Sequence, residues 1–242
     1  MIEVTGVTKT YSAQGTEVRA VDDVHFEVKT GDFVLILGRS GSGKSTLLGM
    51  LAGLIRPTNG VIRFNGKEIG SLSEDKISEL RAKEIGFVFQ FSGLIPTITA
   101  LENVMLPTLF SPNGSGSRSE ALKLLKRVGM SHRADAYPRT LSSGEMKRVA
   151  IARALINGPA LIIADEPTGD LDVDTEYEIM ELFRELNREG KTIVMVTHNP
   201  DLVPYANRTY GMDRGKLVQR SDPFPFRMVP EGGAQPHQSD RP

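Results

Sequence analysis

The segment that most constrains the fold of this chain is a glycine-rich run at residues 38–46, which reads GRSGSGKST. The apolar residues 33–37 before it predict a buried strand, and residues 44–54 after it predict a helix. A glycine loop ending in Gly-Lys-Ser, between a strand and a helix, is the context in which this pattern binds the phosphates of a nucleotide. We therefore predict a nucleoside triphosphate site, with a glycine-rich turn without a ligand as the alternative.

The chemistry expected of this loop follows from its residue types. Its glycines let backbone N–H groups curl around an anion, and the following helix adds its positive N-terminal end. Lys44 is expected to reach the outer phosphates, and the hydroxyl of Ser45 is expected to bind Mg²⁺. The residues predicted to contact the nucleotide here are Gly38, Ser40, Gly41, Ser42, Gly43, Lys44, Ser45 and Thr46.

Composition excludes several other classes of function. The 242 residues include 29 basic and 30 acidic side chains, and this balance gives nucleic acid no electrostatic basis for binding. The absence of cysteine excludes disulfides and thiolate chemistry, and it is compatible with a reducing compartment. The polar N-terminus does not resemble a signal peptide, and no run approaches about 18 apolar residues. We therefore expect no direct membrane insertion, so that any membrane role would come through a partner chain.

The pattern of elements indicates an α/β fold with a mostly parallel, wound sheet, because apolar strands alternate with helices. Residues 1–28 alternate apolar and polar side chains and predict an antiparallel N-terminal β subdomain with a turn near residues 13–15. Further strands are predicted at residues 61–64, 85–89, 161–164 and 192–196, and a hairpin at 209–212 and 216–219. Helices are predicted at residues 119–128, 143–156 and 175–189, and a loop at 91–107 with a helix after it.

The chain is long enough for one large α/β domain with a sizeable core. We expect this domain to span residues 1–220, with a helix-rich subdomain inserted at about residues 91–154. The composition of residues 111–117 predicts a flexible linker. A disordered tail is predicted at residues 221–242, because Pro, Gly, Gln and charged side chains dominate there.

Two carboxylates end the apolar run at residues 161–166, which reads LIIADE. This position places them at the carboxyl edge of the sheet, beside the phosphate loop. Asp165 is expected to hold Mg²⁺ through water, and Glu166 is suited to polarise the water that attacks the γ-phosphate. An acidic cap between strand and loop is the alternative, and the phosphate loop makes the functional interpretation the better one.

A third motif, residues 141–145, reads LSSGE and opens the helical run MKRVAIARAL. Ser142 can cap this helix and Glu145 can complete a capping box, which makes the helix N-terminus an anion site. The motif resembles the LSGGQ signature of ATP-binding-cassette (ABC) transporter ATPases. The order of motifs is also similar to that family: phosphate loop, signature, Asp-Glu strand, and a histidine after the next strand. Two positions depart from the pattern, since Ser143 replaces the first glycine and Glu145 replaces glutamine.

The resemblance, which covers residues 1–220, implies an ATPase that uses ATP and Mg²⁺ and works as a homodimer. In the family, the signature of one subunit closes over the γ-phosphate held by the other subunit, so Ser142 and Gly144 are expected nucleotide contacts. Gln90 resembles the glutamine that binds Mg²⁺ and orients water, and His198 resembles the histidine that contacts the γ-phosphate. A surface glutamine and a structural histidine are the alternatives.

Two further residues are expected at the nucleotide because of the resemblance. Residues 169–172 resemble the D-loop that crosses the dimer interface, with Asp172 as the expected contact. Asp170 stands in this loop where asparagine or alanine is commoner in the family. Tyr11 resembles the aromatic side chain that stacks on adenine, and core packing is the alternative for it.

Residues 88–104 are similar to a segment of the ATPase subunits of lipoprotein-release and macrolide-export systems (LolD-like and MacB-like). This implies an integral membrane permease as partner, contacted near residues 91–97, and a cytoplasmic location on the inner face of the membrane through that partner. The side chains expected in the contact are Phe91, Leu94, Ile95 and Pro96, with a core loop as the alternative. The alternative functions are a soluble P-loop ATPase and a P-loop kinase, which would carry an arginine-bearing lid and no LSSGE helix.

Overall fold

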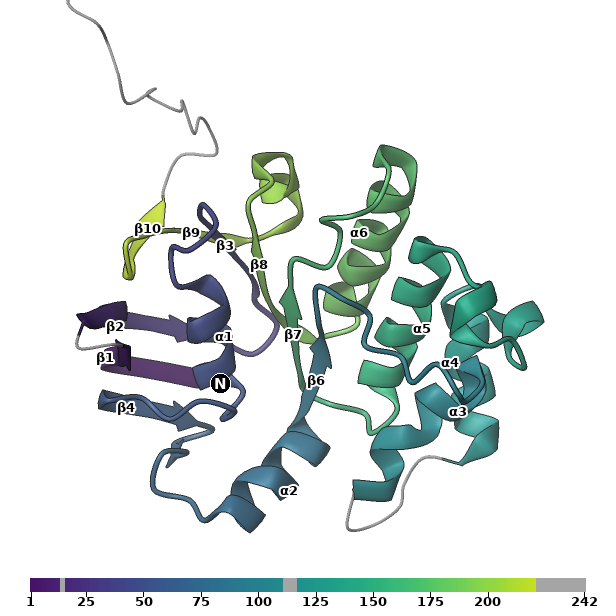
Figure 1. The fold of residues 1–242 in the computed structure, drawn as a ribbon, viewed down its shortest axis with the longest axis horizontal. Coiled ribbons are helices and arrows are strands. Elements are labelled where there is room, and N and C mark those ends of the chain that lie inside the picture. Colours follow the sequence, from purple (N-terminus) through teal and green to yellow (C-terminus); the bar gives the residue numbers. More distant parts are fainter. Residues whose placement is uncertain (14–15, 111–116, 221–242) are drawn as a thin grey trace, which may run out of the picture.

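The computed structural model describes residues 1–13, 16–110 and 117–220 (Figure 1). Its strands are β1 Ile2–Ala13, β2 Thr16–Val28, β3 Phe33–Leu37, β4 Asn59–Phe64, β5 Lys67–Glu68, β6 Ile85–Val88, β7 Leu161–Asp165, β8 Thr192–Thr197, β9 Arg208–Asp213 and β10 Lys216–Arg220. Its α-helices are α1 Lys44–Leu51, α2 Glu74–Glu84, α3 Ala100–Met105, α4 Arg118–Arg127, α5 Ser143–Leu155 and α6 Val173–Arg188. Short 3₁₀ segments are η1 Leu106–Phe110, η2 Ser131–Arg133, η3 Pro138–Thr140 and η4 Pro200–Tyr205. The turn at 14–15, most of the linker at 111–117 and the tail at 221–242 lie outside the described residues.

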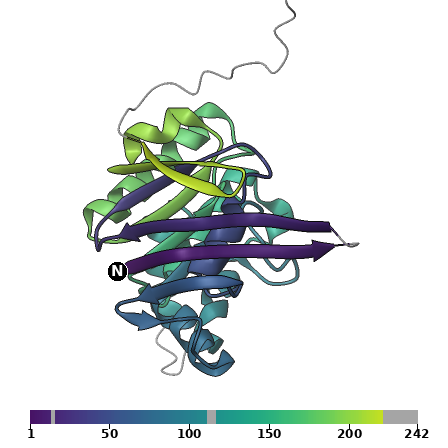
Figure 2. The ribbon, with the colours of Figure 1, turned by 90° about the vertical axis from the view of Figure 1, so that its left-hand side faces the viewer.

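An antiparallel sheet forms one end of the molecule. Its strand order is β2-β1-β4-β5, and Figure 2 shows the long strands β1 and β2 side by side with β4 beside them. Alternate residues of β2, Val24, Phe26 and Val28, are buried, because one face of the sheet covers the core. Between β4 and β5, Asn65 and Gly66 have φ of 49° and 78°, as a two-residue hairpin turn requires. The predicted antiparallel strands are confirmed.

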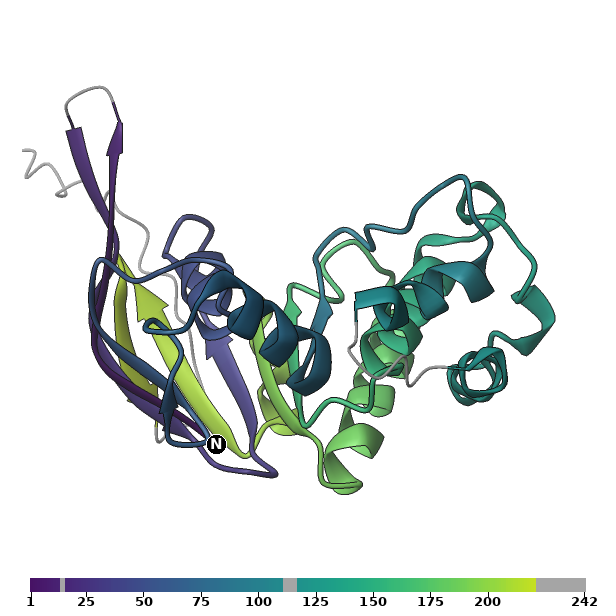
Figure 3. The ribbon, with the colours of Figure 1, turned by 90° about the horizontal axis from the view of Figure 1, so that it is seen from below.

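A mostly parallel sheet runs through the middle of the molecule in the order β10-β9-β3-β8-β7-β6. Every residue of β3 is buried because both faces of the sheet are covered. Val34 and Ile36 face α1 and the antiparallel sheet, whereas Leu35 faces the helical layer formed by α3–α6. Figures 1 and 3 show this arrangement, with the antiparallel strands at one end and α3–α5 at the other. The predicted fold class is confirmed.

The carboxyl ends of the parallel strands meet at one edge of this sheet. The register pairs Leu37 of β3 with Thr197 of β8, and Asp165 of β7 with Val196. Val88 of β6 pairs with Ala164, so the segment after β6 begins at the same edge. The loops that follow these four strands are therefore neighbours, although they are far apart in the sequence. This edge is where ligands of open α/β sheets bind.

Two helices differ from the sequence-based expectation. The loop predicted at 91–107 contains α3 rather than preceding a helix, and α3 begins with a capping box of Thr99 and Glu102. Helix α2 was not predicted. It is capped by Ser73 and buries only Ile77, so its polar sequence carries no apolar period that would reveal it.

The helical layer includes the segment for which an inserted subdomain is predicted. Residues 91–154 contain α3, α4 and nearly all of α5, and these helices share one core with the outer face of the parallel sheet. The boundaries of the subdomain stay a prediction. Across the described residues, no helix is both long enough and apolar enough to cross a bilayer.

Candidate active site

The phosphate loop, residues 38–46, connects the end of β3 to the start of α1 (Figure 1). Gly43 has a φ of 105°, which side chains rarely allow, and a Cβ there would lie 2.1 Å from the carbonyl oxygen of Ala20. A Cβ on Gly38 would lie 2.5 Å from the carbonyl oxygen of Met212. In the described part of the chain, no side chain caps the N-terminus of α1. Its first N–H groups are therefore left for an anion, as the sequence predicts.

Lys44 is buried within this loop, and its ammonium lies close to backbone carbonyl oxygens and to a carboxylate. Its Nζ donates to the carbonyl oxygens of Gly38, at 2.7 Å, and Arg39, at 3.0 Å. The same Nζ lies 3.4 Å from Oε1 of Glu166, at the end of β7. The ammonium thus joins the phosphate loop to the carboxylate that the sequence predicts as the catalytic base.

Asp165 is held at the end of β7 close to Ser45. Burial raises the pKa of the Asp165 carboxyl and the Glu166 carboxylate adds to the rise, whereas a hydrogen bond with Ser45 and the Lys44 charge oppose it. Among the described residues, Oδ1 of Asp165 and Oγ of Ser42 are buried without a hydrogen-bond partner. A buried oxygen without a hydrogen-bond partner destabilises the folded chain unless a ligand bonds to it. Carboxylate and hydroxyl oxygens are also the ligands that Mg²⁺ prefers.

Glu166 is fixed from both sides at the centre of the site. Its Oε2 lies 2.6 Å from Nδ1 of His198, and the backbone N–H of His198 donates to the same oxygen at 3.4 Å. The residue has a φ of 45°, which is strained for a side chain other than glycine. The Glu166 backbone is held in place by donation of its N–H to the carbonyl of Val196. Lys44, Glu166 and His198 therefore form one connected set of charged and polar groups.

The signature residues form the capping box that the sequence predicts. Ser142 caps α5 and its Oγ accepts from the backbone N–H of Glu145, while Oε2 of Glu145 accepts from the N–H of Ser142. These bonds lower the pKa of Glu145, the backbone bond from Ser142 most strongly, and the paired Arg133 adds to the effect. A Cβ on Gly144 would lie 2.6 Å from Cγ2 of Thr175 in α6. Packing against α6 therefore explains Gly144 without a ligand, a reason that the sequence alone does not reveal.

The signature and the phosphate loop lie on elements that cover opposite faces of the parallel sheet. Buried side chains of α1 belong to the core between the two sheets, and those of α5 belong to the core of the helical layer. Figure 1 shows α1 and α5 on opposite sides of β7. Ser142 and Gly144 thus lie on a different layer from the residues that the structure brings together in one chain, which are Lys44, Ser45, Asp165, Glu166 and His198.

A family model described as ABC transporter matches residues 21–169 of the 242. The chain belongs to the ABC transporter family. It is 43% identical to the macrolide export ATP-binding/permease protein MacB of Chlorobaculum tepidum, over 97% of this chain and 37% of that protein. It is 47% identical to an uncharacterized ABC transporter ATP-binding protein of Thermotoga maritima, over 84% of this chain and 87% of that protein.

Solved structures agree with this assignment. The ATP-binding cassette MJ0796, in a dimeric post-hydrolysis state bound to ADP and Pi, is 40% identical with a TM-score of 0.85, over 91% of this chain and 98% of that one. The predicted family and ATPase class are confirmed, and the alternative of a P-loop kinase is wrong. The chain spans about a third of the length of the MacB relatives that it matches.

The loop after β6 shows where this ABC cassette places Gln90. The Gln90 side chain is exposed at the carboxyl edge of the sheet, and the backbone carbonyl oxygen of Gln90 accepts from Nζ of Lys147 at 2.6 Å. Phe91 is 75% exposed, whereas Leu94 packs against the helical core. The predicted partner contact is thus divided between exposed and packed side chains. Sequence reasoning missed Lys147, although it shares a helical stripe with the buried Ile151 of α5.

The two remaining predicted contacts of the cassette lie at its surface. Tyr11 on β1 is 40% exposed, so core packing does not describe it, and Nζ of Lys9 lies 5.3 Å from its ring centroid. Asp172 caps α6, accepting from the backbone N–H of Thr175 at 3.0 Å and from its hydroxyl at 2.7 Å. These bonds lower the pKa of Asp172, that from the Thr175 backbone most strongly. Within one chain, Asp172 is therefore the N-cap of α6.

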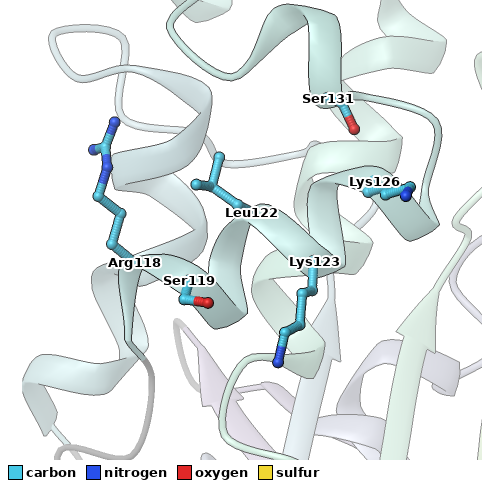
Figure 4. Close-up of a pocket in the computed structure, with 6 residues that line it drawn as sticks. All are labelled: Arg118, Ser119, Leu122, Lys123, Lys126 and Ser131. Carbon is cyan, nitrogen blue, oxygen red and sulfur yellow. The ribbon is translucent and has the colours of Figure 1, made fainter.

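A pocket on α4 contains none of the predicted site residues. Figure 4 shows Leu122 between Arg118 and Lys126, with Ser131 across the hollow. The lining side chains are all exposed, and Lys123 pairs with Glu120 at 3.2 Å. Because no buried polar group points into it, this pocket is not a second candidate for the nucleotide.

Proposed function

We propose that this cassette binds and hydrolyses ATP with Mg²⁺, dimerises when ATP is bound, and drives an integral membrane permease of the macrolide-export or lipoprotein-release type. One observation supports this most directly. The Glu166 carboxylate is held between Lys44 and His198, at the sheet edge where the phosphate loop begins. A fixed carboxylate beside a phosphate-binding loop is suited to activate a water for attack on phosphorus.

Residues of this chain fit a magnesium ion. Ser45 lies close enough to Asp165 to lower the pKa of its carboxyl, and Oδ1 of Asp165 lacks a partner within the described residues. Together with Gln90 at the neighbouring strand end, they would hold Mg²⁺ with oxygen ligands. Bound there, the ion would neutralise charge on the phosphates.

The chain's own residues then divide the work. Phosphate oxygens attract the Lys44 ammonium away from the carbonyls of Gly38 and Arg39, because a charged acceptor bonds it more strongly. Glu166 is left to accept the proton of the attacking water, and Oε1 is the oxygen not already bonded to His198. His198 holds that carboxylate in position through Nδ1, which leaves Nε2 to face the γ-phosphate. The N–H groups of the phosphate loop and of α1 stabilise the charge that develops.

Dimerisation accounts for the residues that one chain keeps apart. The phosphate loop and the signature cover opposite faces of the sheet, so a composite site would join the loop of one copy to Ser142 and Gly144 of the other. Asp172 would lie at the same contact, and the exposed ring of Tyr11 would stack on adenine. A dimeric structure of the related cassette MJ0796, 42% identical over 90% of this chain, supports this arrangement.

Coupling to the membrane is proposed through residues 91–97. The exposed side chains of Phe91 and Ile95 supply apolar surface beside Gln90, and the related MacB proteins are named as joint ATP-binding and permease proteins. The cassette would then lie on the cytoplasmic face of the membrane, attached through the permease. Ile95→Glu should leave ATP binding intact and release the cassette from detergent-solubilised permease. Full retention of Ile95→Glu in such a complex would contradict this contact.

Replacement of Glu166 by Gln tests the reaction and the dimer together. We expect Glu166→Gln to bind ATP as the unchanged protein does, to hydrolyse it about 10²–10⁴-fold more slowly, and to elute as a dimer with Mg²⁺ and ATP. Lys44→Ala is the control for binding, and it should weaken nucleotide affinity and leave the protein monomeric. Steady hydrolysis by Glu166→Gln removes Glu166 as the base. A monomer under the same conditions removes the composite site.

A further inference from the structure

A buried ammonium links the signature helix to the loop that carries Gln90. Lys147, in α5, is only 5% exposed, and its Nζ donates to the carbonyl oxygens of Phe89 at 3.1 Å and Gln90 at 2.6 Å. Phe89 and Gln90 directly follow β6, so these bonds cross from one element to another. Lysine is rarely buried unless its ammonium is paired or hydrogen-bonded, so these two bonds are what allow Lys147 to be buried here.

The electrostatic surroundings of Lys147 include a third element. Burial lowers the pKa of the Lys147 ammonium, and the carboxylate of Asp170 opposes this effect. Asp170 lies between β7 and α6, in the loop that follows the predicted catalytic carboxylate. The bonds of Lys147 therefore join the signature helix to the Gln90 loop, and the negative charge that acts on it lies in the loop after Glu166.

The rest of the Gln90 loop is tied to the same helix. Arg153 of α5 donates through Nη2 to the carbonyl oxygen of Ser92 and through Nη1 to that of Gly93, each at 2.7 Å. Two cations of one helix thus hold four carbonyl oxygens within five consecutive residues. Because an α-helix is rigid over this length, a displacement of its N-terminus at Ser142 would move the Gln90 main chain with it.

We propose that Lys147 is a positioning residue for ATP hydrolysis, which fixes the main chain of Gln90 to the signature helix so that Ser142 and the Gln90 amide move together. This inference rests on the role proposed for Gln90 at the metal and the water. Lys147 itself touches neither nucleotide nor water. It acts by placing Gln90 once the signature has met the γ-phosphate.

Lys147→Met tests this, because it keeps the length and apolar volume of the side chain and removes the ammonium. Lys191→Met is a matched control, since Lys191 also donates to two consecutive carbonyls, those of Gly158 and Pro159. The full chain is measured for kcat, for ATP affinity, and for amide hydrogen exchange in peptides that cover residues 86–99. Gln90→Ala and the double variant Lys147→Met/Gln90→Ala complete a cycle.

We expect Lys147→Met to lower kcat roughly ten- to a hundredfold, which is the effect of misplacing a catalytic group by about 1 Å. ATP affinity should stay within about twofold, because the phosphate loop is untouched. Exchange should become faster at residues 89–94, and the double variant should be no slower than Gln90→Ala. Lys191→Met should keep its kcat. Lys147→Gln, whose amide can still donate to a carbonyl, should recover part of the rate, and it carries the same test if Lys147→Met does not fold.

The outcomes separate the two proposals. If Gln90→Ala is slow but Lys147→Met and Lys147→Gln hydrolyse ATP at the unchanged rate, Lys147 has no positioning role and Gln90 keeps its own. If Gln90→Ala hydrolyses ATP normally, the role of Gln90 is wrong and the inference falls with it. Additive losses in the double variant mean that Lys147 acts elsewhere, which also overturns the inference.

Discussion

The phosphate loop and the Gln90 loop lie at the same edge of the sheet, but they are held in opposite ways. The phosphate loop is held by close backbone packing, since Gly38 and Gly43 approach carbonyls of β9 and β2 too closely for any side chain, and the side chain that bonds its carbonyl oxygens, Lys44, belongs to the loop itself. The Gln90 loop is held from outside, because side chains of α5 and α3 take its carbonyl oxygens. Lys147 and Asn103 show this most clearly, with bonds to Gln90 and Ile95.

This difference decides how each region can respond to a ligand. A loop fixed by backbone packing keeps its shape, so the phosphate loop offers the same N–H groups before and after a nucleotide binds. A loop fixed by the side chains of a neighbouring helix follows that helix when it moves. The phosphate loop is therefore suited to binding, and the Gln90 loop to transmitting movement. Substitutions that loosen one loop at a time test this difference.

The largest effect is expected at Gly43. Gly43→Ala places a Cβ 2.1 Å from the backbone oxygen of Ala20 at a φ of 105°, so strand β2 or the loop must move. We expect the free energy of unfolding to fall by about 3 kcal/mol or more, and ATP binding to be lost. Denaturant unfolding and nucleotide titration measure both.

Gly41→Ala is the matched control for this change. Gly41 has a φ of 77°, but a Cβ there meets nothing within 4 Å. The cost should therefore be that of the backbone alone, about 1–2 kcal/mol. Equal losses in Gly41→Ala and Gly43→Ala would show that close packing does not hold this loop.

The next largest effect is expected at Asn103, which holds the Gln90 loop from α3. Asn103 is fully buried, accepts from the N–H of Ile95 at 2.7 Å, and donates to the carbonyls of Ile95, Ile98 and Thr99. Asn103→Ala leaves these groups unpaired and should cost about 2–3 kcal/mol of unfolding free energy, because a buried polar group without a partner is destabilising. ATP affinity should change by less than about twofold, because the buried side chains of α3 and of α1 belong to different cores.

A useful control for Asn103 is Asn187→Ala. Asn187 also bonds backbone carbonyls, those of Gly31 and Lys191, which precede β3 and β8, whereas Gln90 follows the carboxyl end of β6. Asn187→Ala should lower the free energy of unfolding without making amide exchange faster at residues 89–99. If Asn103→Ala weakens ATP binding as much as it weakens the fold, the two regions are not independent.

The same contrast explains what the sequence can reveal. The phosphate loop, the buried strands β3, β7 and β8, and the Asp165–Glu166 pair are local patterns, and each was predictable because chain neighbours determine it. Lys147 and Asn103 were not identified, since their partners lie 57 residues away in one case and in an irregular loop in the other. Their only sequence signal is a polar residue on an otherwise apolar helical stripe, as Lys147 is with Ile151 and Leu155. Helix α2 gave no signal, because it buries one side chain.

A smaller effect is expected from the strained backbone at Glu166. Its φ of 45° disfavours a Cβ, whereas the positive φ in the Gln90 loop is carried by Gly93. Glu166→Gly should therefore unfold less readily than Glu166→Ala, by about 1 kcal/mol, because both lack the carboxylate and only the alanine keeps the strain. Ala164, within strand β7, is the control position, where Ala164→Gly should be less stable than the unchanged protein. Denaturation of these variants measures the difference, and equal stability of Glu166→Ala and Glu166→Gly would mean that the backbone relaxes at no cost.

The smallest effect concerns the signature, at Glu145. The bonds from Ser142, assisted by Arg133, lower its pKa in the folded chain, so the charged carboxylate stabilises the fold above the ordinary glutamate pKa of about 4.3. That contribution is lost as pH falls through the lowered value. Glu145→Gln keeps the capping box but not the charge, and it should cost less than about 1 kcal/mol at neutral pH, because Glu145 and Arg133 are both partly exposed and solvent screens the pair. The difference between the two proteins in denaturant unfolding should shrink to nothing in acid, and in an Arg133→Met background it should be smaller at every pH. A difference that stays constant with pH would show that the charge of Glu145 does not contribute to the stability of α5.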